Sequence, residues 1–457
     1  MDTLTGKHLL ILGLARQGMA LARFAVSVGA KVTVSDLRLA EQLQANLAAL
    51  ADCPIAYVLG EHPLSLLDGV DVVAVSGSVP ASAPIVRVAV ERGIPVTNDS
   101  QLFAERNPAR RTMGITGSAG KTTTTTLTGR LCLASGVTTW VGGNIGQPLI
   151  GCLDQIQPQD YVVQELSSFQ LEWWRRSPAV AAVLNITPNH LDRHRTMAAY
   201  SDAKANILRH QEQDGVAVLC ADDPGALALA PLVRGRLRLF SRRQTVTDGA
   251  FLRDKQLWLA DDGRATPVCA LEDIQLRGQH NISNVLAAIT LADSVGVPAA
   301  VMREAIASFT GVPHRLEPVR VLHGVLYIND SIATAPERAL AAINAFHEPL
   351  VLLAGGRDKD MVWDDWARTV QQRVKAVVLF GLLAPALADY LAAQSRNGQT
   401  PPPVVRCHTL GEAVQAAARL AQPGDVVLLS PGGTSYDAYT DFVARGEHFR
   451  QLVRDLC

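Results

Sequence analysis

The chain has 457 residues, which is too long for one hydrophobic core and predicts about two to four domains. Hydrophobic residues make up 48% of the sequence and charged residues 19%, as is typical of a globular protein. A net charge of −1 gives no long-range attraction to nucleic acid or to an anionic membrane. This charge balance excludes proteins that bind either of them mainly by charge.

The cysteine pattern and the start of the chain bear on location. Seven cysteines are scattered and no two form a C-x-x-C pair, so we expect reduced thiols rather than a disulfide framework or a zinc site. No apolar run approaches the ~18 residues needed to span a bilayer. Residues 1–7 lack the basic-then-apolar order of a signal peptide. We therefore expect a cytoplasmic protein without membrane insertion. We also expect it to be a monomer.

The first predicted unit is a strand, a glycine turn, a helix and a second strand. An apolar run at 8–12 ends in the turn 13–18, and a second strand at 31–35 ends at Asp36. Asp36 lies where the ribose-binding acid of a dinucleotide-binding fold would fall. Ala15 replaces the middle glycine of G-x-G-x-x-G, so a dinucleotide pyrophosphate would fit less closely. A degenerate Rossmann unit is favoured, and a nicotinamide-dependent dehydrogenase is the alternative.

The strongest motif is an apolar strand that leads into Gly117-Ser118-Ala119-Gly120-Lys121-Thr122 and then into a helix. This arrangement aims several backbone N–H groups and the positive end of the helix at one point, which is how proteins hold phosphate. Lys121 would reach the terminal phosphates, and the Thr122 hydroxyl would coordinate Mg²⁺. The regular P-loop pattern has a glycine where this chain has Ile115, so a plain glycine turn with a solvated lysine is the alternative.

Polar side chains follow the next predicted strands of this unit. Apolar runs at 161–164, 179–184 and 216–219, separated by helical stretches, predict a mostly parallel sheet with helices on both faces. Glu165 follows the first of these strands and would either coordinate Mg²⁺ or cap the next helix. His190 lies in the loop after the second strand and would hold Mg²⁺ or orient a substrate.

Three further features of this unit have plainer interpretations. His190 and His194 are four residues apart, as in a zinc pair, but no glutamate follows the first and a proline precedes both. Zinc is therefore disfavoured, and His194 is expected on the surface. Lys204 is the lone lysine of an amphipathic helix and, taken by itself, is expected to be solvated. A helix is predicted within 278–295, with Asn281 as its N-cap.

A domain boundary is predicted at Gly311-Val312-Pro313, and a third α/β unit follows it. Arg315 lies at this hinge and would either clamp ATP phosphates or form a linker salt bridge. Three polar turns follow predicted strands of this unit and would face one crevice, where an anionic ligand such as a carboxylate would fit. These turns begin at Asp330, Gly355 and Ser430.

In these motifs the chain resembles the Mur ligases, the ATP-dependent amide-forming enzymes of peptidoglycan assembly. The resemblance covers essentially the full length and implies three consecutive α/β domains. These are a Rossmann-like domain for the UDP substrate at 1–98, a P-loop-type ATPase domain at 99–311 and a Rossmann-like domain for the amino acid at 312–457. Seven motifs carry the resemblance in the family's order, at 117–123, 142–146, 165–172, 189–193, 278–284, 313–315 and 430–437.

Within the family, the motifs are similar to those of the enzyme that adds glutamate to UDP-N-acetylmuramoyl-L-alanine. The implied reaction is two-step: the substrate carboxylate takes the γ-phosphate of ATP to give an acyl phosphate, and the glutamate amine then displaces phosphate. D-Glutamate is favoured because most matched pocket residues are retained. L-Glutamate is an alternative because Ile332 stands where many relatives have lysine. A folylpolyglutamate-synthase-like ligase and a regulator that has lost catalysis are further alternatives.

The resemblance also implies the site residues. It assigns catalysis to Lys121, His190 and Lys204, with Lys204 carried as a carbamate, and Mg²⁺ to Thr122, Glu165, His190 and Lys204. It assigns ATP binding to Gly117, Ser118, Ala119, Gly120, Lys121, Thr122, Thr123, Asn281, Asn284, Arg315 and Asp330. It assigns the UDP substrate to Gly13, Leu14, Ala15, Arg16, Asp36, Arg38, Asn144 and Ser167, and glutamate to Thr334, Lys359, Ser435 and Phe442. The turn Ser76-Gly77-Ser78 departs from the family's Ser-Pro-Gly, so the resemblance assigns no contact to the uridine there.

Overall fold

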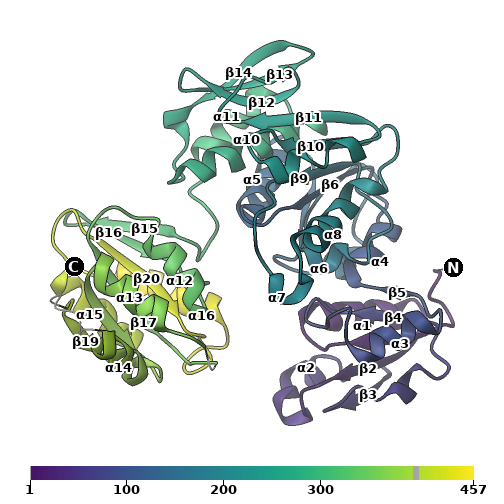
Figure 1. Cartoon of the computed structure of the whole chain (residues 1–457), viewed down its shortest axis with the longest axis horizontal. Helices are drawn as coiled ribbons and strands as arrows, with labels where there is room; N and C mark the ends of the chain where they lie inside the picture. The colour runs from purple at the N-terminus through teal and green to yellow at the C-terminus, as the bar shows by residue number, and fades with distance from the viewer. Residues whose placement is uncertain (1, 360, 395–400) are drawn as a thin grey trace. The chain divides into compact units, whose positions relative to one another are not determined.

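The computed structural model describes residues 2–359, 361–394 and 401–457, and the chain divides into two compact units, Met1–Phe309 and Thr310–Cys457 (Figure 1). The first unit contains two β-sheets and the second unit contains one. Over the described ranges, no helix is both long enough and apolar enough to cross a membrane.

The first sheet has five parallel strands in the order β3-β2-β1-β4-β5. Its central strand is an apolar run because both faces are covered: Leu9 and Ile11 pack in one cluster, and Leu10 and Leu12 pack in another. The elements are β1 (His8–Leu12), α1 (Arg16–Ser27), β2 (Lys31–Asp36), α2 (Gln44–Ala49), β3 (Ile55–Leu59), β4 (Val72–Val75), α3 (Pro84–Glu91), β5 (Val96–Thr97) and α4 (Asp99–Arg106).

The second sheet has nine strands in the order β14-β13-β12-β11-β10-β9-β6-β8-β7. It is parallel from β7 to β12, and β13 and β14 extend it antiparallel. The strands are β6 (Arg111–Thr116), β7 (Thr139–Gly143), β8 (Tyr161–Glu165), β9 (Val180–Val183), β10 (Val216–Cys220), β11 (Arg236–Ser241), β12 (Gly249–Arg253), β13 (Gln256–Asp261) and β14 (Arg264–Ala270). The helices are α5 (Lys121–Ala134), α6 (Ser168–Leu171), α7 (Leu191–His194), α8 (Met197–Arg209), α9 (Pro224–Leu227), α10 (Gln279–Ser294) and α11 (Ala299–Ala307).

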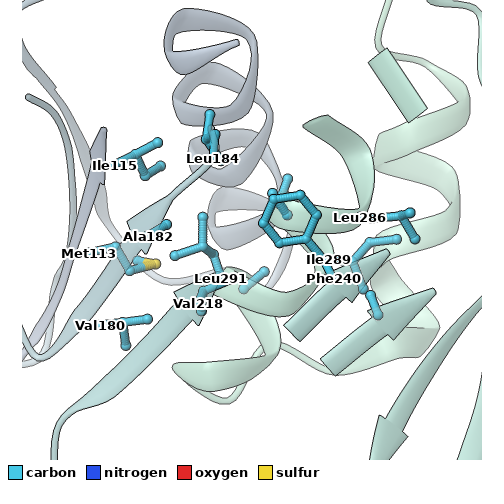
Figure 2. Close-up of a cluster of buried hydrophobic side chains, with 14 of the residues drawn as sticks. Met113, Ile115, Val180, Ala182, Leu184, Val218, Phe240, Leu286, Ile289 and Leu291 are labelled. Carbon is cyan, nitrogen blue, oxygen red and sulfur yellow. The ribbon is translucent and has the colours of Figure 1, made fainter. Parts of the chain in front are cut away.

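One continuous apolar core joins this sheet to α5 and α10 (Figure 2). Because both helices bury side chains in the same cluster, the start of α10 is held beside the start of α5, at the carboxyl end of β6. The labelled members are Met113, Ile115, Val180, Ala182, Leu184, Val218, Phe240, Leu286, Ile289 and Leu291.

The second unit is a six-stranded sheet in the order β15-β16-β20-β17-β18-β19, parallel except for β15. Two apolar clusters cover its two faces, as expected for a parallel sheet between helices. The elements are β15 (Glu317–Leu322), β16 (Val325–Asn329), α12 (Pro336–Ile343), β17 (Leu350–Gly355), α13 (Asp364–Arg373), β18 (Val374–Phe380), α14 (Ala384–Gln394), β19 (Val404–Arg406), α15 (Leu410–Leu420), β20 (Val426–Gly432) and α16 (Phe442–Arg454).

The predicted α/β class is confirmed, with three parallel-rich sheets in succession. Two local expectations were wrong or incomplete. The N-cap of α10 is Gly278, with φ = 91°, and Asn281 lies inside the first turn, where its Nδ2 atom donates to the Arg277 carbonyl. The strands β11 to β14 were not predicted, because their segment lacks the continuous apolar runs that mark the inner strands.

Candidate active site

The phosphate loop has the predicted strand–turn–helix form. β6 ends one residue before the glycine turn, and α5 begins at Lys121 with Thr122 and Thr123 in its first turn. Gly120 has φ = 84°, and a Cβ atom there would lie 2.3 Å from Oδ1 of Asn284, so a side chain has no room. The N-terminal N–H groups of α5 therefore open onto a loop whose shape depends on glycine.

Lys121 lies over this loop. Its Nζ atom donates hydrogen bonds to the carbonyl oxygens of Gly117 (2.8 Å) and Ser118 (3.2 Å). These bonds hold the ammonium group beside the backbone N–H groups at the start of α5. A cation and several N–H donors facing one small space form a site suited to an anion, phosphate above all.

The residues after β9 clasp the loop. The backbone N–H of Ala119 donates to Oδ1 of Asn185 (2.8 Å), and Nδ2 of Asn185 donates back to the Ala119 carbonyl (3.1 Å). The Ser118 hydroxyl donates to the Thr187 carbonyl (2.9 Å) and accepts from the Tyr200 hydroxyl (3.1 Å). Asn185 and Tyr200 were not among the predicted site residues. The signal for Asn185 was its position directly after the strand beside β6.

Lys204 is the largest departure from expectation on residue type alone. It is 1% exposed, so the interpretation of a solvated side chain was wrong. Its Nζ atom donates to Oγ1 of Thr116 (3.2 Å) and to the Gly117 carbonyl (3.0 Å), and it lies 4.7 Å from the ring centre of Tyr200. Burial and the nearby charge of Lys121 lower the pKa of Lys204 well below its ordinary value, against the opposing charge of Glu165.

Glu165 ends β8, the strand that pairs with β6 on the side away from β9. It is 2% exposed, and its Oε1 atom accepts a hydrogen bond from Nδ2 of Asn144 (2.7 Å). Its Oε2 atom is buried without a hydrogen-bond partner among the described residues. The helix-cap alternative was wrong, because the N-cap of α6 is Ser167, whose hydroxyl accepts from the Gln170 N–H. Ser167 was expected to bind substrate, and in the structure its hydroxyl caps this helix.

The oxygen atoms of Glu165 and Thr122 fit Mg²⁺, which phosphates help to bind, better than they fit a metal whose ligands are all protein side chains. A buried carboxylate oxygen without a hydrogen bond is a ready oxygen ligand, and Thr122 offers a hydroxyl at the start of α5. Over the described ranges, no three His, Cys, Asp or Glu side chains gather closely enough to hold a metal by themselves. Mg²⁺ is commonly bound by one or two carboxylates together with substrate phosphates, which this donor set matches.

His190, the N-cap residue of α7, and His194, its last residue, differ sharply. His190 is exposed, has φ = 53°, and lies edge-on to Phe169 with ring centres 5.0 Å apart. His194 was expected on the surface and is buried, 7% exposed. Its Nε2 atom lies 2.9 Å from the Ser168 hydroxyl, and its Nδ1 atom lies 3.2 Å from Oε1 of Glu172. Since both ring nitrogens of His194 have protein partners, the zinc-pair alternative loses its second ligand.

Asn281 and Asn284 lie in the first turns of α10, beside the phosphate loop. Nδ2 of Asn284 donates to Oδ1 of Asn281 (2.9 Å), and Oδ1 of Asn284 accepts from the Thr124 hydroxyl of α5 (3.4 Å). The structure thus brings both residues to the loop, as the motif order implied.

A second glycine turn of the first unit, at residues 13–16, joins β1 of the first sheet to α1. Gly13 and Leu14 are buried at the end of β1, and Ala15 and Arg16 are exposed at the start of α1. Asp36, at the end of β2, accepts from the Leu14 N–H (2.7 Å), and two guanidinium nitrogens of Arg38 donate to its carboxylate. Burial by itself would raise the pKa of Asp36, but these hydrogen bonds outweigh it and lower the pKa to about 2. The Asp36 carboxylate is therefore charged and shapes the turn.

In the second unit, the three predicted polar turns lie at one edge of the sheet, because β16, β20 and β17 are adjacent and parallel. Arg357 and Thr434 form a backbone bridge that joins two of the turns. Lys359 is exposed, with Nζ 5.6 Å from the ring centre of Tyr436, and Ser435 is buried. The other expected residues of this unit are exposed Arg315, half-buried Thr334 after β16 and half-buried Phe442 at the start of α16.

Arg445 was not among the predicted site residues and is fully buried in α16. Its guanidinium donates to the Ser331 carbonyl (2.9 Å), the Ser331 hydroxyl (3.0 Å) and the Gly433 carbonyl (3.2 Å), and so ties two of the turns together. Burial lowers the pKa of Arg445 to about 10. The available signal was its spacing of four and eight residues from Phe449 and Val453, on the apolar face of the helix.

Asp330 is buried at the end of β16, where its carboxylate accepts from the Ser430 hydroxyl (2.9 Å) and the Leu316 N–H (3.1 Å). Burial raises the pKa of Asp330 to about 7 in spite of these bonds. The folded chain therefore holds this proton more tightly than the unfolded chain does. The contribution of this proton to the free energy of unfolding is fully present below the pKa of an ordinary aspartate. It is lost as the pH rises through about 7.

We therefore expect Asp330→Asn to remove a pH-dependent part of the stability. Between about pH 5 and about pH 8 the wild-type free energy of unfolding should fall by on the order of 3 kcal/mol more than that of the variant. Calorimetry of both proteins at the two pH values measures this difference. Equal pH dependence in both would show that Asp330 ionises as freely when folded as when unfolded.

Three family profiles match consecutive parts of this chain. The profile for the N-terminal domain of MurD-like Mur ligases matches residues 7–98, the Mur ligase middle domain matches 115–292, and the glutamate ligase domain of Mur ligases matches 314–433. The middle match contains the phosphate loop, Glu165 and Lys204.

Curated relatives match almost the whole chain. A UDP-N-acetylmuramoylalanine–D-glutamate ligase from Symbiobacterium thermophilum is 43% identical over 98% of this chain and 97% of its own length. The protein of the same name from Pelotomaculum thermopropionicum is 39% identical over 99% of this chain and 98% of its own length. Fold and loop define the class as an α/β protein that holds phosphate at the start of a helix. The chain belongs to the Mur ligase family, which confirms the resemblance seen in its motifs.

Solved structures share the fold. UDP-N-acetylmuramate–alanine ligase from Thermotoga maritima aligns with a TM-score of 0.58 at 19% identity, covering 98% of this chain and 99% of that one. A UDP-N-acetylmuramoyl-L-alanyl-D-glutamate–2,6-diaminopimelate ligase aligns with a TM-score of 0.57 at 18% identity, covering 100% and 94%. At these identities the likeness concerns architecture alone.

Proposed function

We propose that this chain is an ATP-dependent ligase that joins D-glutamate to UDP-N-acetylmuramoyl-L-alanine in the synthesis of peptidoglycan precursors. The observation that carries the proposal is the grouping of Lys121, Lys204 and Glu165 around a phosphate loop. The near-full-length likeness to relatives with this activity in their names supports the choice of substrates.

The three sheets suggest a division of labour. We assign the UDP-substrate domain to residues 1–98, the ATP domain to 99–311 and the amino-acid domain to 312–457. Gly13 to Arg16, Asp36, Arg38, Asn144 and Ser167 would form the UDP-substrate side, and in this assignment Asp36 and Ser167 act by shaping the backbone, since their side chains are already engaged. The free, scattered cysteines agree with a cytoplasmic protein. That the chain acts as a monomer stays a prediction.

ATP would lie over the loop formed by residues 117–120, with Lys121, Thr122 and Thr123 at its phosphates and Asn281 and Asn284 beside them. Mg²⁺ would be held by Thr122, Glu165 and His190 together with a modified Lys204. When bound, the metal would neutralise charge on the phosphates during transfer. That Arg315 and Asp330 contact ATP stays a prediction from the motifs.

We further propose that Lys204 carries a carbamate. The amine must be neutral to attack CO₂, and burial beside Lys121 favours the neutral form. The neutral nitrogen forms a bond to the carbon of CO₂, one C=O bond of CO₂ becomes a C–O⁻ single bond, and the nitrogen releases one proton to solvent, so that a neutral amine becomes an anionic carbamate. This group would face the loop, since Nζ already lies against Thr116 and Gly117.

In the reaction, the residues of this chain align groups and stabilise charge. The substrate carboxylate attacks the γ-phosphorus of ATP, ADP leaves, and an acyl phosphate forms; the glutamate amine then attacks the acyl carbon and phosphate leaves. Lys121 would stabilise negative charge on the transferring phosphoryl group. Lys359 and Ser435 would hold the carboxylates of glutamate, and Thr334 and Phe442 would shape the rest of its pocket.

The activity is tested by phosphate release. We expect release only when ATP, UDP-N-acetylmuramoyl-L-alanine and glutamate are all present. Release with a folate substrate in place of the UDP substrate would favour a folylpolyglutamate-synthase-like ligase. No release under any of these conditions would favour a nucleotide-binding regulator without catalysis.

The enantiomer is tested by parallel assays with D- and L-glutamate. We expect kcat/KM to favour D-glutamate by at least about tenfold, which corresponds to ~1.4 kcal/mol in the transition state. The physical reason is that the two enantiomers direct the α-carboxylate differently relative to the amine. A tenfold preference for L-glutamate would overturn the choice of enantiomer and leave the ligase proposal standing.

A further inference from the structure

Arg193, in α7, reaches across to the first sheet. Its guanidinium donates hydrogen bonds to the carbonyl oxygens of Val79 (2.7 Å) and Ser78 (3.3 Å). Both carbonyls belong to the turn that follows β4, more than a hundred residues earlier in the chain. A side chain from α7, which belongs to the second-sheet region, is thus hydrogen-bonded to the backbone of the first sheet's β4 turn.

While the edge of the guanidinium donates these hydrogen bonds, its flat face packs on the aromatic ring of Phe169. The Cζ atom of Arg193 lies 4.4 Å from the ring centre of Phe169, which is close enough for a cation–π contact. Phe169 also contacts both histidines of α7: His190 edge-on at 5.0 Å and His194 stacked at 5.3 Å. The arginine, the ring and the two imidazoles therefore form one packed group.

The turn contacted by Arg193 begins at Ser76, and Ser76 packs against Gly13 in the glycine turn that follows β1. Ser76 is buried, and a Cβ atom on Gly13 would lie 2.1 Å from its hydroxyl oxygen. The Ser76 hydroxyl also lies 3.1 Å from that of Ser78, whose carbonyl accepts from Arg193. A continuous path of contacts therefore joins the turn at Gly13 to the helix that presents His190.

Apolar packing also joins the two sheets, because Leu149, Ile150, Ile156 and Val162 lie in the same buried cluster as Leu9 and Ile11. A pocket of about 190 Å³ lies beside the Arg193 contact, and its lining includes Pro80, Ala81, Ser82, Glu172, His194 and Arg195. Because this pocket leaves space between the turn and α7, the hydrogen bonds of Arg193 have a larger share in fixing the local position of the turn.

We propose that Arg193 is a positioning residue. It holds the turn at residues 76–80, which lies against the glycine turn at Gly13, in a fixed position relative to α7 and the phosphate loop. The proposal rests on the proposed function, and it deepens that function by naming how a substrate bound by one sheet is aligned with ATP on the next. Arginine suits this role because its planar group donates to two carbonyls while it stacks on a ring, which lysine cannot do.

The first test uses Arg193→Met, which keeps the apolar stem and removes the donors. We expect kcat to fall by about 10- to 100-fold, as small misplacements of reacting groups do. KM for ATP and the Kd for UDP alone should stay within about twofold, because Arg193 is not among the residues assigned to either ligand. Arg193→Lys should recover only part of kcat. Arg195→Met is the matched control, since this exposed neighbour has no hydrogen bond to the turn among the described contacts, and it should retain wild-type kcat.

The second test does not depend on ligase activity. Hydrogen exchange is measured with and without UDP in the wild type and in Arg193→Met. We expect UDP to protect residues 76–80 and 191–195 together in the wild type, and residues 76–80 alone in the variant. Should Arg193→Met not fold, Phe169→Leu removes the stacking platform instead and should weaken the same coupling.

The outcomes separate the two proposals. An active wild type whose kcat is unchanged in Arg193→Met would overturn the role of Arg193 and leave the ligase standing. A wild type without activity would count against the proposed function, while coupled protection by UDP would still support the role of Arg193. Equal protection of residues 191–195 by UDP in wild type and variant would overturn that role whatever the activity.

Discussion

Lys121→Ala should cost on the order of 10³-fold in kcat, because it removes a preorganised cation from the point where charge moves during phosphoryl transfer. Nζ of Lys121 is held by two loop carbonyls, so it needs little rearrangement when a phosphate arrives. Acyl-phosphate formation can be measured without glutamate, by trapping the acyl group with hydroxylamine as a hydroxamate. We expect almost no hydroxamate from the variant.

The matched control is Arg130→Ala, which removes a cation from the exposed end of the same helix, where it donates to the Ser308 hydroxyl. It should turn over as the wild type does. Both variants should fold, because neither side chain is part of the apolar core. Turnover of Lys121→Ala within about tenfold of wild type would remove this lysine from the phosphate-transfer step.

Much of the site was predictable because its signals are local in sequence. A strand, a glycine turn and a helix follow one another directly at Gly117 to Thr122, so the phosphate loop is written in one continuous segment. Glu165 ends β8 and Asp330 directly follows β16, so each lies at the carboxyl-end edge of its own sheet, where ligands of parallel sheets gather.

The remainder depended on contacts between segments far apart in the chain. The partners of the buried Lys204 ammonium are Thr116 and Gly117, far earlier in the chain, although its spacing of four residues from Tyr200 and from Leu208 places it on the apolar face of its own helix. His194 is buried because Ser168 and Glu172 supply partners for its two ring nitrogens. Arg445 was missed for the same reason, since its bonds reach a turn about a hundred residues away.

These misses share a physical cause. A buried cation or imidazole is unfavourable unless hydrogen bonds replace its water, so residue type alone predicts exposure. Each exception is a residue for which the fold supplies carbonyl, hydroxyl or carboxylate partners, and Lys204 and Arg445 each bond to a turn that the proposed function uses.

Lys204→Ala should be nearly inactive and should partly recover in millimolar formate or acetate. If Lys204 works as a carbamate, the variant lacks a carboxylate beside the loop, and the cavity left by the side chain can admit a small one from solution. Lys204→Arg should not recover, because a guanidinium takes up no CO₂ and stays positively charged next to Lys121. Steady-state kcat against formate concentration should rise and saturate for the alanine variant alone.

The controls separate a lost anion from a lost cation. The same formate concentrations should leave the wild type unchanged and should not restore Lys121→Ala, whose missing group is positive. A neutral molecule of similar size, such as formamide, should not restore Lys204→Ala. Full activity in Lys204→Arg would show that the buried side chain acts as a cation or only fills space. In that case the oxygen donors at the loop would reduce to Thr122, Glu165 and the phosphates themselves, and the low pKa of Lys204 would be a consequence of its burial with no part in the chemistry.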